Sequence, residues 1–192
     1  MTQKILDNVR LFVNLNNEDE EAFLKILDIK NYKKKEFLME DGDVCDKISF
    51  INSGCIRAFF LIDGIENTFQ FLFENGWYTD YESFLTGQPT SVNLQFLEDS
   101  VVVQFKKTDL MKLYGTNPVF ERLARIMAER AALKVTNLYR MLQNQEPEER
   151  YLSLLDERPE LVEKIPQHYI ASFLGIKPQS LSRIRKRIFN KK

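Results

Sequence analysis

Apolar residues between positions 167 and 188 repeat every three or four residues in two short blocks, with a glycine between them. The first block predicts a helix that Gly175 ends, because glycine adopts a positive φ at a helix C-terminus without strain. Pro178 suits the first turn of a second helix, where a backbone N–H would lack an intrahelical partner in any case. The expected buried positions are Ile170, Ala171, Leu174, Ile176, Leu181, Ile184 and Ile188. This spacing predicts a helix-turn-helix.

The opposite face of the second helix is polar and basic. Gln179, Ser180 and Arg183 project together from its first half, and cations crowd its far end and flanks. Such a face offers hydrogen bonds to base edges and positive charge to phosphates. The predicted DNA-contacting residues are Lys177, Gln179, Ser180, Arg183, Arg185, Lys186 and Arg187. The alternative is a helical hairpin used only for packing, with a basic end that serves solubility.

Further helices are expected at the N-terminus, within residues 2–27, where apolar stripes follow a helical period. Asn17 is the expected N-cap of the second stripe, because acidic residues follow it and the helix dipole favours them there.

Residues 31–106 instead show short apolar or alternating runs separated by turn residues, a pattern typical of strands in a sandwich or barrel. Asp63-Gly64 is the strongest hairpin signal, because both residue types tolerate positive φ in a two-residue turn. Most of the 15 phenylalanines lie in this segment. The pattern predicts an antiparallel β-body with a phenylalanine-rich core.

A long amphipathic helix is predicted over residues 118–145, after a short helix for which Thr108 is the expected N-cap. A helix of this length spans roughly 40 Å, more than one small β-body needs to cover. We therefore expect its apolar seam to pack against the same helix of a second subunit. The alternative is packing wholly within its own domain. The seam consists of Phe120, Leu123, Met127, Ala131, Val135, Leu138 and Leu142.

Pro147 breaks the helical run, and a short helix then begins a C-terminal helical domain.

The charge is divided unevenly along the chain. The 192 residues hold 27 Lys and Arg against 28 Asp and Glu. Residues 163–192 contain eight of those basic residues and one of the acidic ones, which leaves 19 basic and 27 acidic residues in the rest. A basic end suits phosphates, while an acidic body discourages indiscriminate contact with nucleic acid.

Several classes of protein are excluded by composition. No run approaches the roughly eighteen apolar residues that cross a bilayer, and the N-terminus lacks the apolar region of a signal peptide, so we expect a cytoplasmic protein without membrane contact. Cys45 and Cys55 are expected to be buried thiols, with a disulfide as the alternative. The one histidine, His168, precedes the glycine turn, so the β-body lacks the histidine cluster of a metal enzyme of the cupin type. We expect no catalytic residues and no metal site.

The order of a β-roll, a long helix and a helix-turn-helix resembles the cyclic-AMP receptor and fumarate-nitrate regulator (Crp/Fnr) family of bacterial transcription regulators. The segments that carry the resemblance are FLMEDGD, ISFINSGCIRAFF, ESFLTGQPTSVNLQFLED and IASFLGIKPQSLSRIRKRI. It implies an α+β fold with an antiparallel β-roll, a double-stranded jelly roll, over residues 1–115. A dimerisation helix over 116–145 and a DNA-binding domain over 146–192 would follow.

The resemblance also locates a phosphate-binding cassette, and there this chain departs from the family pattern. Its expected pocket residues are Asp80, Tyr81, Glu82, Thr90 and Ser91. Thr90 stands where nucleotide-binding members have an arginine, and Asp80 lies near their glutamate position. Because threonine cannot neutralise a phosphate, we expect weak or absent cyclic-nucleotide binding. The pocket then binds another effector or nothing.

Other effector chemistries are limited by the residues present. An iron–sulfur cluster needs four thiolates, and the chain has two cysteines. Haem would need an axial ligand in the β-body or the long helix, for which Cys45 and Cys55 are the remaining candidates. We therefore expect no cofactor, and the effector is left unidentified.

The DNA-binding end departs from the family pattern as well. Four residues follow Ile188, so we expect the β-hairpin wing of the family to be truncated. Arg183 matches the base-contacting arginine, while Gln179 replaces a glutamate and would prefer adenine over cytosine.

The sequence thus predicts a homodimeric DNA-binding transcription regulator whose half-sites lie about 10 bp apart. Its expected partners are double-stranded DNA, a second copy of the chain, RNA polymerase and an unidentified small molecule. The alternative function is a ligand-binding regulatory module that acts on a protein partner through a vestigial DNA domain.

Overall fold

The computed structural model describes residues 2–190, apart from the side chain of Phe189. Lys191 and Lys192, expected to extend the basic end, lie outside the described residues. The prediction of a truncated β-hairpin wing concerns the same end of the chain and stays a prediction. The chain falls into two compact units. The first unit contains the chain up to residue 58 together with 71–131, and the second contains 59–70 together with the chain from 132 onward.

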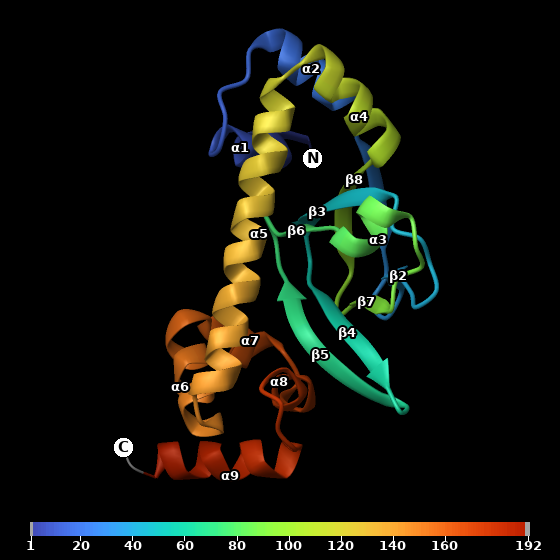
Figure 1. Cartoon of the computed structure of the whole chain (residues 1–192). Helices are drawn as coiled ribbons and strands as arrows, with labels where there is room; N and C mark the ends of the chain where they lie inside the picture. Colours follow the sequence, from blue (N-terminus) through green and yellow to red (C-terminus); the bar gives the residue numbers. More distant parts are fainter. Residues whose placement is uncertain (1, 191–192) are drawn as a thin grey trace. The chain divides into compact units, whose positions relative to one another are not determined.

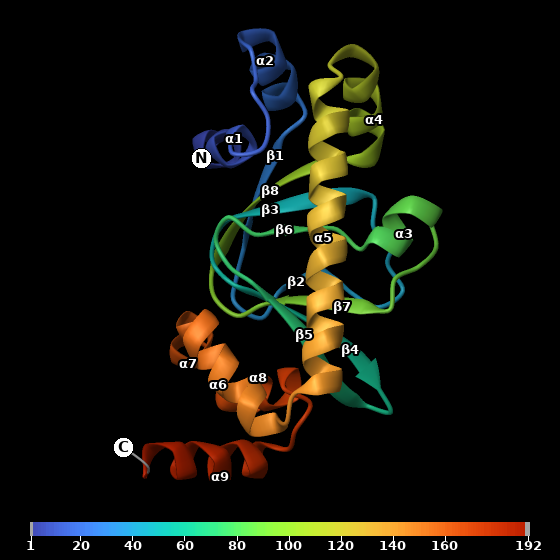
Figure 2. The same ribbon diagram turned by 60° about the vertical axis from the view of Figure 1, so that its left-hand side comes forward.

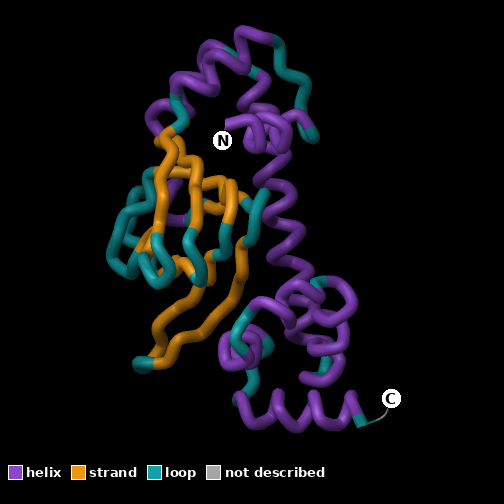
Figure 3. The backbone as a smooth tube through the Cα atoms, turned by 180° about the vertical axis from the view of Figure 1, so that it is seen from behind, coloured by secondary structure: helices purple, strands orange, loops and turns teal. Residues whose placement is uncertain are grey.

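The strands form two four-stranded sheets (Figure 1). One sheet has the order β1-β8-β3-β6, formed by Asp28–Tyr32, Ser100–Lys106, Lys47–Ser53 and Trp77–Tyr78. The other has the order β2-β7-β4-β5, formed by Phe37–Met39, Val92–Phe96, Ile56–Ile62 and Ile65–Leu72. The pairs β1 with β8, β3 with β8, β3 with β6 and β2 with β7 are all antiparallel. The predicted antiparallel, sandwich-like β-body is therefore confirmed, and Figure 3 shows its strands in orange.

The core of this body is rich in phenylalanine, as predicted. Phe50, Phe96 and Phe105 are at most 5% exposed. In the first unit, the helices α1 (Thr2–Arg10), α2 (Asn17–Lys25) and α4 (Lys107–Thr116) contribute apolar faces to the same core. The ring of Phe23 in α2 lies 5.5 Å from that of Phe105 and 5.2 Å from that of Phe120. Aromatic contacts thus join α2 to the sheet.

The hairpin between β4 and β5 turns at Asp63 and Gly64, as predicted. Their φ angles are +50° and +76°, the left-handed values that a two-residue turn between twisted strands requires.

Two predicted helix caps were wrong. The N-cap of α2 is Asn16, whose side chain accepts a hydrogen bond from the Asp19 N–H at 2.8 Å, while Asp19 accepts one from the Asn16 N–H. This reciprocal capping box sets the N-cap at Asn16 and leaves Asn17 as the first residue of the helix. Thr108 does not cap α4, because the preceding strand runs directly into the helix, with Lys106 at the cap position.

The C-terminal half of the chain is helical. The helix α5 covers Val119–Asn144, close to the predicted span, and appears as one continuous helix in Figure 2. The predicted single helix after Pro147 is divided into α6 (Pro147–Glu157) and α7 (Pro159–Lys164), because Pro159 starts a new helix at its first turn. The last helices, α8 (Gln167–Phe173) and α9 (Pro178–Phe189), enclose the turn at Gly175.

The capping box at α2 predicts different effects for two neighbouring asparagines. Asn16→Ala should lower the free energy of unfolding by about 1 kcal/mol, because it removes the cap side chain. Asn17→Ala is the matched control and should change it by less than about 0.5 kcal/mol, because Asn17 is exposed and lies inside the helix. Urea denaturation of both variants measures this, and a larger loss for Asn17→Ala would contradict the assignment.

Candidate nucleic-acid interface and effector cassette

The turn between α8 and α9 is closed by two backbone hydrogen bonds. Gly175 has a φ of +70°, and its N–H donates to the carbonyl oxygen of Ser172 at 3.0 Å. The N–H of Ile176 donates to the carbonyl oxygen of Ala171 at 2.9 Å. These bonds form a Schellman motif, which satisfies the last carbonyls of α8. Gly175 thus has the positive φ that the sequence predicted.

The apolar stripes of both helices are buried in the second unit, except that Ile176 and Ile188, which were expected to be buried, are half-buried. The side chains that form this core, each at most 7% exposed, are Tyr151, Leu154, Leu161, Ile165, Ile170, Ala171, Leu174, Leu181 and Ile184. Because Leu181 and Ile184 face inward, the helical period directs the residues on the other side of α9 to solvent.

That outer face of α9 carries the candidate DNA contacts. Gln179, Arg183 and Lys186 are exposed, and so is Lys177 just before the helix, while Ser180 and Arg185 are half-buried. The Nε of Arg183 donates to the backbone carbonyl oxygen of Gln179 at 3.4 Å, and the helical spacing of four residues places the two side chains on one surface. The structure thus brings most of the predicted residues together at one face.

Arg187 is placed differently from the other cations. Its Nη1 lies 2.6 Å from Oε2 of Glu148 in α6, so this guanidinium joins α9 to α6. A phosphate would compete with this carboxylate for Arg187.

Two exposed residues of this face were missed at the level of sequence. Ser182 and Asn190 lie three and eleven positions after Gln179, on the same side of the helix. With Gln167, Arg185 and Lys186 they line a shallow hollow between α8 and α9. The signal that would have found them is the helical spacing from Gln179, since their small polar side chains suggest nothing in isolation.

The cassette, defined as residues 80–92, lies in the first unit and is built around Asp80 and Thr90. Asp80 caps α3 (Tyr81–Thr86), and its Oδ1 accepts a hydrogen bond from the Ser83 N–H at 3.5 Å. Its Oδ2 accepts a hydrogen bond from the hydroxyl of Thr90, which is 5% exposed. The Thr90 hydroxyl also accepts one from the Val92 N–H at 2.9 Å. The positive end of α3 thus faces the chain's own carboxylate, which would repel a phosphate.

Neighbouring side chains hold this arrangement in place. Ser83 accepts a hydrogen bond from the Cys45 N–H at 2.9 Å and donates one to the carbonyl oxygen of Gln88 at 2.6 Å. The Nζ of Lys107 donates to the carbonyl oxygens of Phe84 and Leu85, where it complements the negative end of α3. Sequence reasoning missed Ser83 and Lys107 because both act through contacts with residues distant in the chain.

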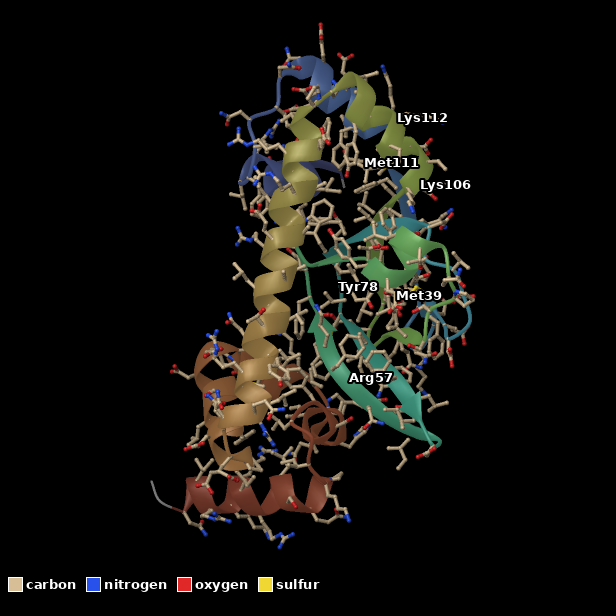
Figure 4. All side chains as sticks on the ribbon, viewed as in Figure 1. Met39, Arg57, Tyr78, Lys106, Met111 and Lys112 are labelled. Atoms are coloured by element: carbon tan, nitrogen blue, oxygen red, sulfur yellow. The ribbon has the colours of Figure 1, made fainter. Side chains whose placement is uncertain are left out.

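The other predicted pocket residues lie at the surface. Tyr81 is 41% exposed, and Glu82 and Ser91 are exposed as well. By contrast, Tyr78, labelled in Figure 4, is held close to the cassette, where burial and the nearby Asp80 carboxylate raise the pKa of its phenol. The five predicted pocket residues therefore divide into a hydrogen-bonded pair, the half-buried Asp80 and the buried Thr90, and three residues open to solvent.

A buried arginine was also missed. Arg57 in β4, labelled in Figure 4, is 1% exposed, and its Nη2 donates to Oε1 of Gln95 in β7 at 3.2 Å. The apolar run around it predicted a strand and offered no signal for a buried cation.

The apolar seam of α5 is buried at the start of the helix and more exposed to solvent further along. Phe120 and Leu123 are at most 8% exposed, so these two residues belong to the core of the first unit. Further along, Val135 is 68% exposed and Leu142 is 43% exposed, and between them Leu138 is half-buried. Leu133 and Tyr139 are exposed apolar residues of the same stretch. A soluble helix rarely exposes this much apolar surface without a partner.

Other site types find little support in the part of the chain that the structure describes. Cys45 and Cys55 are buried and form no disulfide there. The same residues contain no group of three or more His, Cys, Asp or Glu side chains that could hold a metal ion. None of the helices formed by residues 2–190 is long and apolar enough to cross a membrane.

Comparison with known proteins identifies the fold. Residues 29–117 match a family model described as cyclic nucleotide-binding domain. FixK2 of Bradyrhizobium japonicum superposes with a TM-score of 0.75 at 16% identity, covering 86% of this chain and 86% of that one. The c-di-GMP responsive global regulator CLP of Xanthomonas campestris superposes with a TM-score of 0.72 at 16% identity, covering 92% and 93%. The chain shares the fold of these proteins.

The catabolite activator protein of Thermus thermophilus is also similar, with a TM-score of 0.59 at 19% identity over 94% of this chain and 87% of that one. A comparison with the curated proteins finds no match. The resemblance to Crp/Fnr regulators that the sequence suggested is thus supported at the level of fold.

The Schellman turn predicts opposite effects for two glycine substitutions. Gly175→Ala should lower the free energy of unfolding by about 1 kcal/mol, because alanine is strained at positive φ. Gly115→Ala is the matched control and should raise it by up to about 1 kcal/mol, because Gly115 lies in α4 and favours helix less than alanine does. An added Cβ meets nothing within 4 Å at either position, so clashes do not complicate the comparison. Chemical denaturation tests this, and effects of the same sign would contradict the account.

Proposed function

We propose that this chain is a homodimeric, sequence-specific DNA-binding transcription regulator of the Crp/Fnr type. The observation that carries the proposal is the outer face of α9, where Gln179, Arg183 and Lys186 are exposed together at the end of a closed helix-turn-helix. A helix that presents amide and guanidinium groups in this way fits the major groove. Lys177, Ser180 and Arg185 are assigned mainly to phosphates, and Arg187 is shared with Glu148.

The proposed dimer forms through the exposed part of the α5 seam. Met127, Ala131, Val135, Leu138 and Leu142 supply this contact, while Phe120 and Leu123 are already buried in the chain's own core. Two recognition helices related by a two-fold axis would then reach half-sites about 10 bp apart. The protein is proposed to act in the cytoplasm, with RNA polymerase as a further partner.

Cyclic AMP is not the proposed effector. A cyclic phosphate in the cassette would meet the Asp80 carboxylate at the N-terminus of α3, and Thr90, whose hydroxyl donates a hydrogen bond to Asp80, adds no positive charge. A different small molecule is left as the candidate effector. The alternative function, a regulatory module that acts on a protein partner, would leave the exposed basic face of α9 without a ligand.

The DNA-binding assignment predicts that different cations of this face have different effects. With a duplex selected from a random library, Arg183→Ala should cost about 1 to 3 kcal/mol of specific binding and relax the preference at one base pair. Lys177→Ala should weaken binding to all duplexes alike and reduce the salt slope by about one.

Fluorescence anisotropy at several fixed salt concentrations measures both effects. Lys112→Ala, which removes an exposed lysine of α4 in the first unit, is the control and should leave affinity unchanged. Unchanged specific affinity in Arg183→Ala would refute the role of α9. Failure of the wild-type chain to bind any duplex at low salt would favour the protein-partner alternative.

The dimer assignment is tested by one substitution on the seam and another beside it. Val135→Asp should raise the dimer dissociation constant at least roughly tenfold, because it would bury a charge between two apolar helices. Asn137→Asp adds the same charge to an exposed position off the seam and should leave the dimer intact. Sedimentation equilibrium measures both constants, and equal effects would argue against the seam as the interface.

A further inference from the structure

The strand β5 is an edge strand, since it ends the order β2-β7-β4-β5. One side of an edge strand has N–H and C=O groups without a neighbouring strand, and proteins commonly cover such an edge. The hairpin segment 59–70, which contains the first part of β5, belongs to the same unit as α8.

In this unit the side chain of Ser172 bonds to the backbone of this edge strand. The N–H of Thr68 donates to Oγ of Ser172 at 2.9 Å, and the Ser172 hydroxyl donates to the carbonyl oxygen of Glu66 at 2.9 Å. Ser172 lies in the last turn of α8. We call this pair of hydrogen bonds the Ser172 latch.

The latch reproduces the hydrogen bonding of a missing strand. In a parallel ladder, one residue of the neighbouring strand accepts from one N–H and donates to the C=O two residues earlier. A hydroxyl has one donor and two acceptor lone pairs, so Ser172 can take both roles around Asn67. Thr68 is 4% exposed, and its own hydroxyl has no hydrogen-bond partner in the described part of the chain. Loss of Ser172 would therefore leave the Thr68 N–H unsatisfied in a buried place.

Ser172 also belongs to the turn that presents α9. Its carbonyl oxygen accepts the hydrogen bond from the Gly175 N–H, while its side chain holds the hairpin. The outer face of α9 stays exposed in this latched arrangement, so the latch does not cover the candidate DNA contacts.

We propose that Ser172 is a positioning residue that fastens α8 to the edge of β5 and thereby orders α9 for DNA. This inference rests on the proposed DNA-binding function. Without the latch, α8 and α9 sample more orientations, and the fraction of molecules competent to bind a duplex falls.

Hydrogen exchange of the Thr68 amide tests the latch without DNA. In the full-length protein, Ser172→Ala should speed this exchange about tenfold, because the amide loses its acceptor. Ser172→Thr keeps a hydroxyl and should retain the protection. Ser153→Ala, which removes a half-buried serine of α6 in the same unit, is the matched control and should leave Thr68 unchanged. Unchanged exchange in Ser172→Ala, or equal loss in both Ser172 variants, would overturn the latch.

The affinity for DNA tests whether the Ser172 latch orders α9. Ser172→Ala should lower the affinity for a selected duplex about three- to tenfold at fixed salt, while Ser172→Thr and Ser153→Ala should bind like the wild type. Faster Thr68 exchange with unchanged affinity would overturn the proposal that the latch orders α9. If the wild type binds no duplex, the proposed function fails, while the exchange measurement still decides whether the latch exists.

Discussion

The left-handed turn at Gly175 is the constraint on which the candidate DNA interface depends. A positive φ of +70° there lets the last carbonyls of α8 find donors and starts α9 at Pro178. The length of the turn sets the rotation of α9, so Leu181 and Ile184 enter the core while Gln179 and Arg183 face solvent. This rotation decides which residues form the outer face. It directs exposed cations from this basic end of the chain to solvent, where they can meet phosphates.

At two other places, polar groups are satisfied by the chain's own short side chains. In the cassette, the Asp80 carboxylate and the Thr90 hydroxyl bond to each other at the helix terminus where a phosphate would otherwise be favoured. At the edge of β5, the Ser172 hydroxyl supplies what a neighbouring strand would supply. In both places a short polar side chain forms hydrogen bonds that a bound phosphate or a neighbouring strand could otherwise form.

Periodic features could be predicted from the sequence, and features that depend on distant contacts could not. The glycine turn, the Asp63-Gly64 hairpin, the long helix and the phenylalanine-rich β-body follow from local spacing and residue type. Asn16 was missed because both adjacent asparagines have a carboxylate three residues along, Asp19 for Asn16 and Glu20 for Asn17, so the local sequence does not separate them. Ser172 and Lys107 were missed for another reason, since their partners lie 104 and 23 residues away, at positions that no local pattern connects.

The central claim is that two copies of α9 bind DNA together, and its most direct test is the symmetry of the preferred site. Selection of duplexes from a random library by the purified chain, with and without cyclic AMP, measures it. The account predicts a two-fold symmetric motif with half-sites about 10 bp apart that is enriched equally under both conditions. Enrichment of an asymmetric motif would contradict the dimer, and enrichment that depends on cyclic AMP would contradict the interpretation of Asp80 and Thr90.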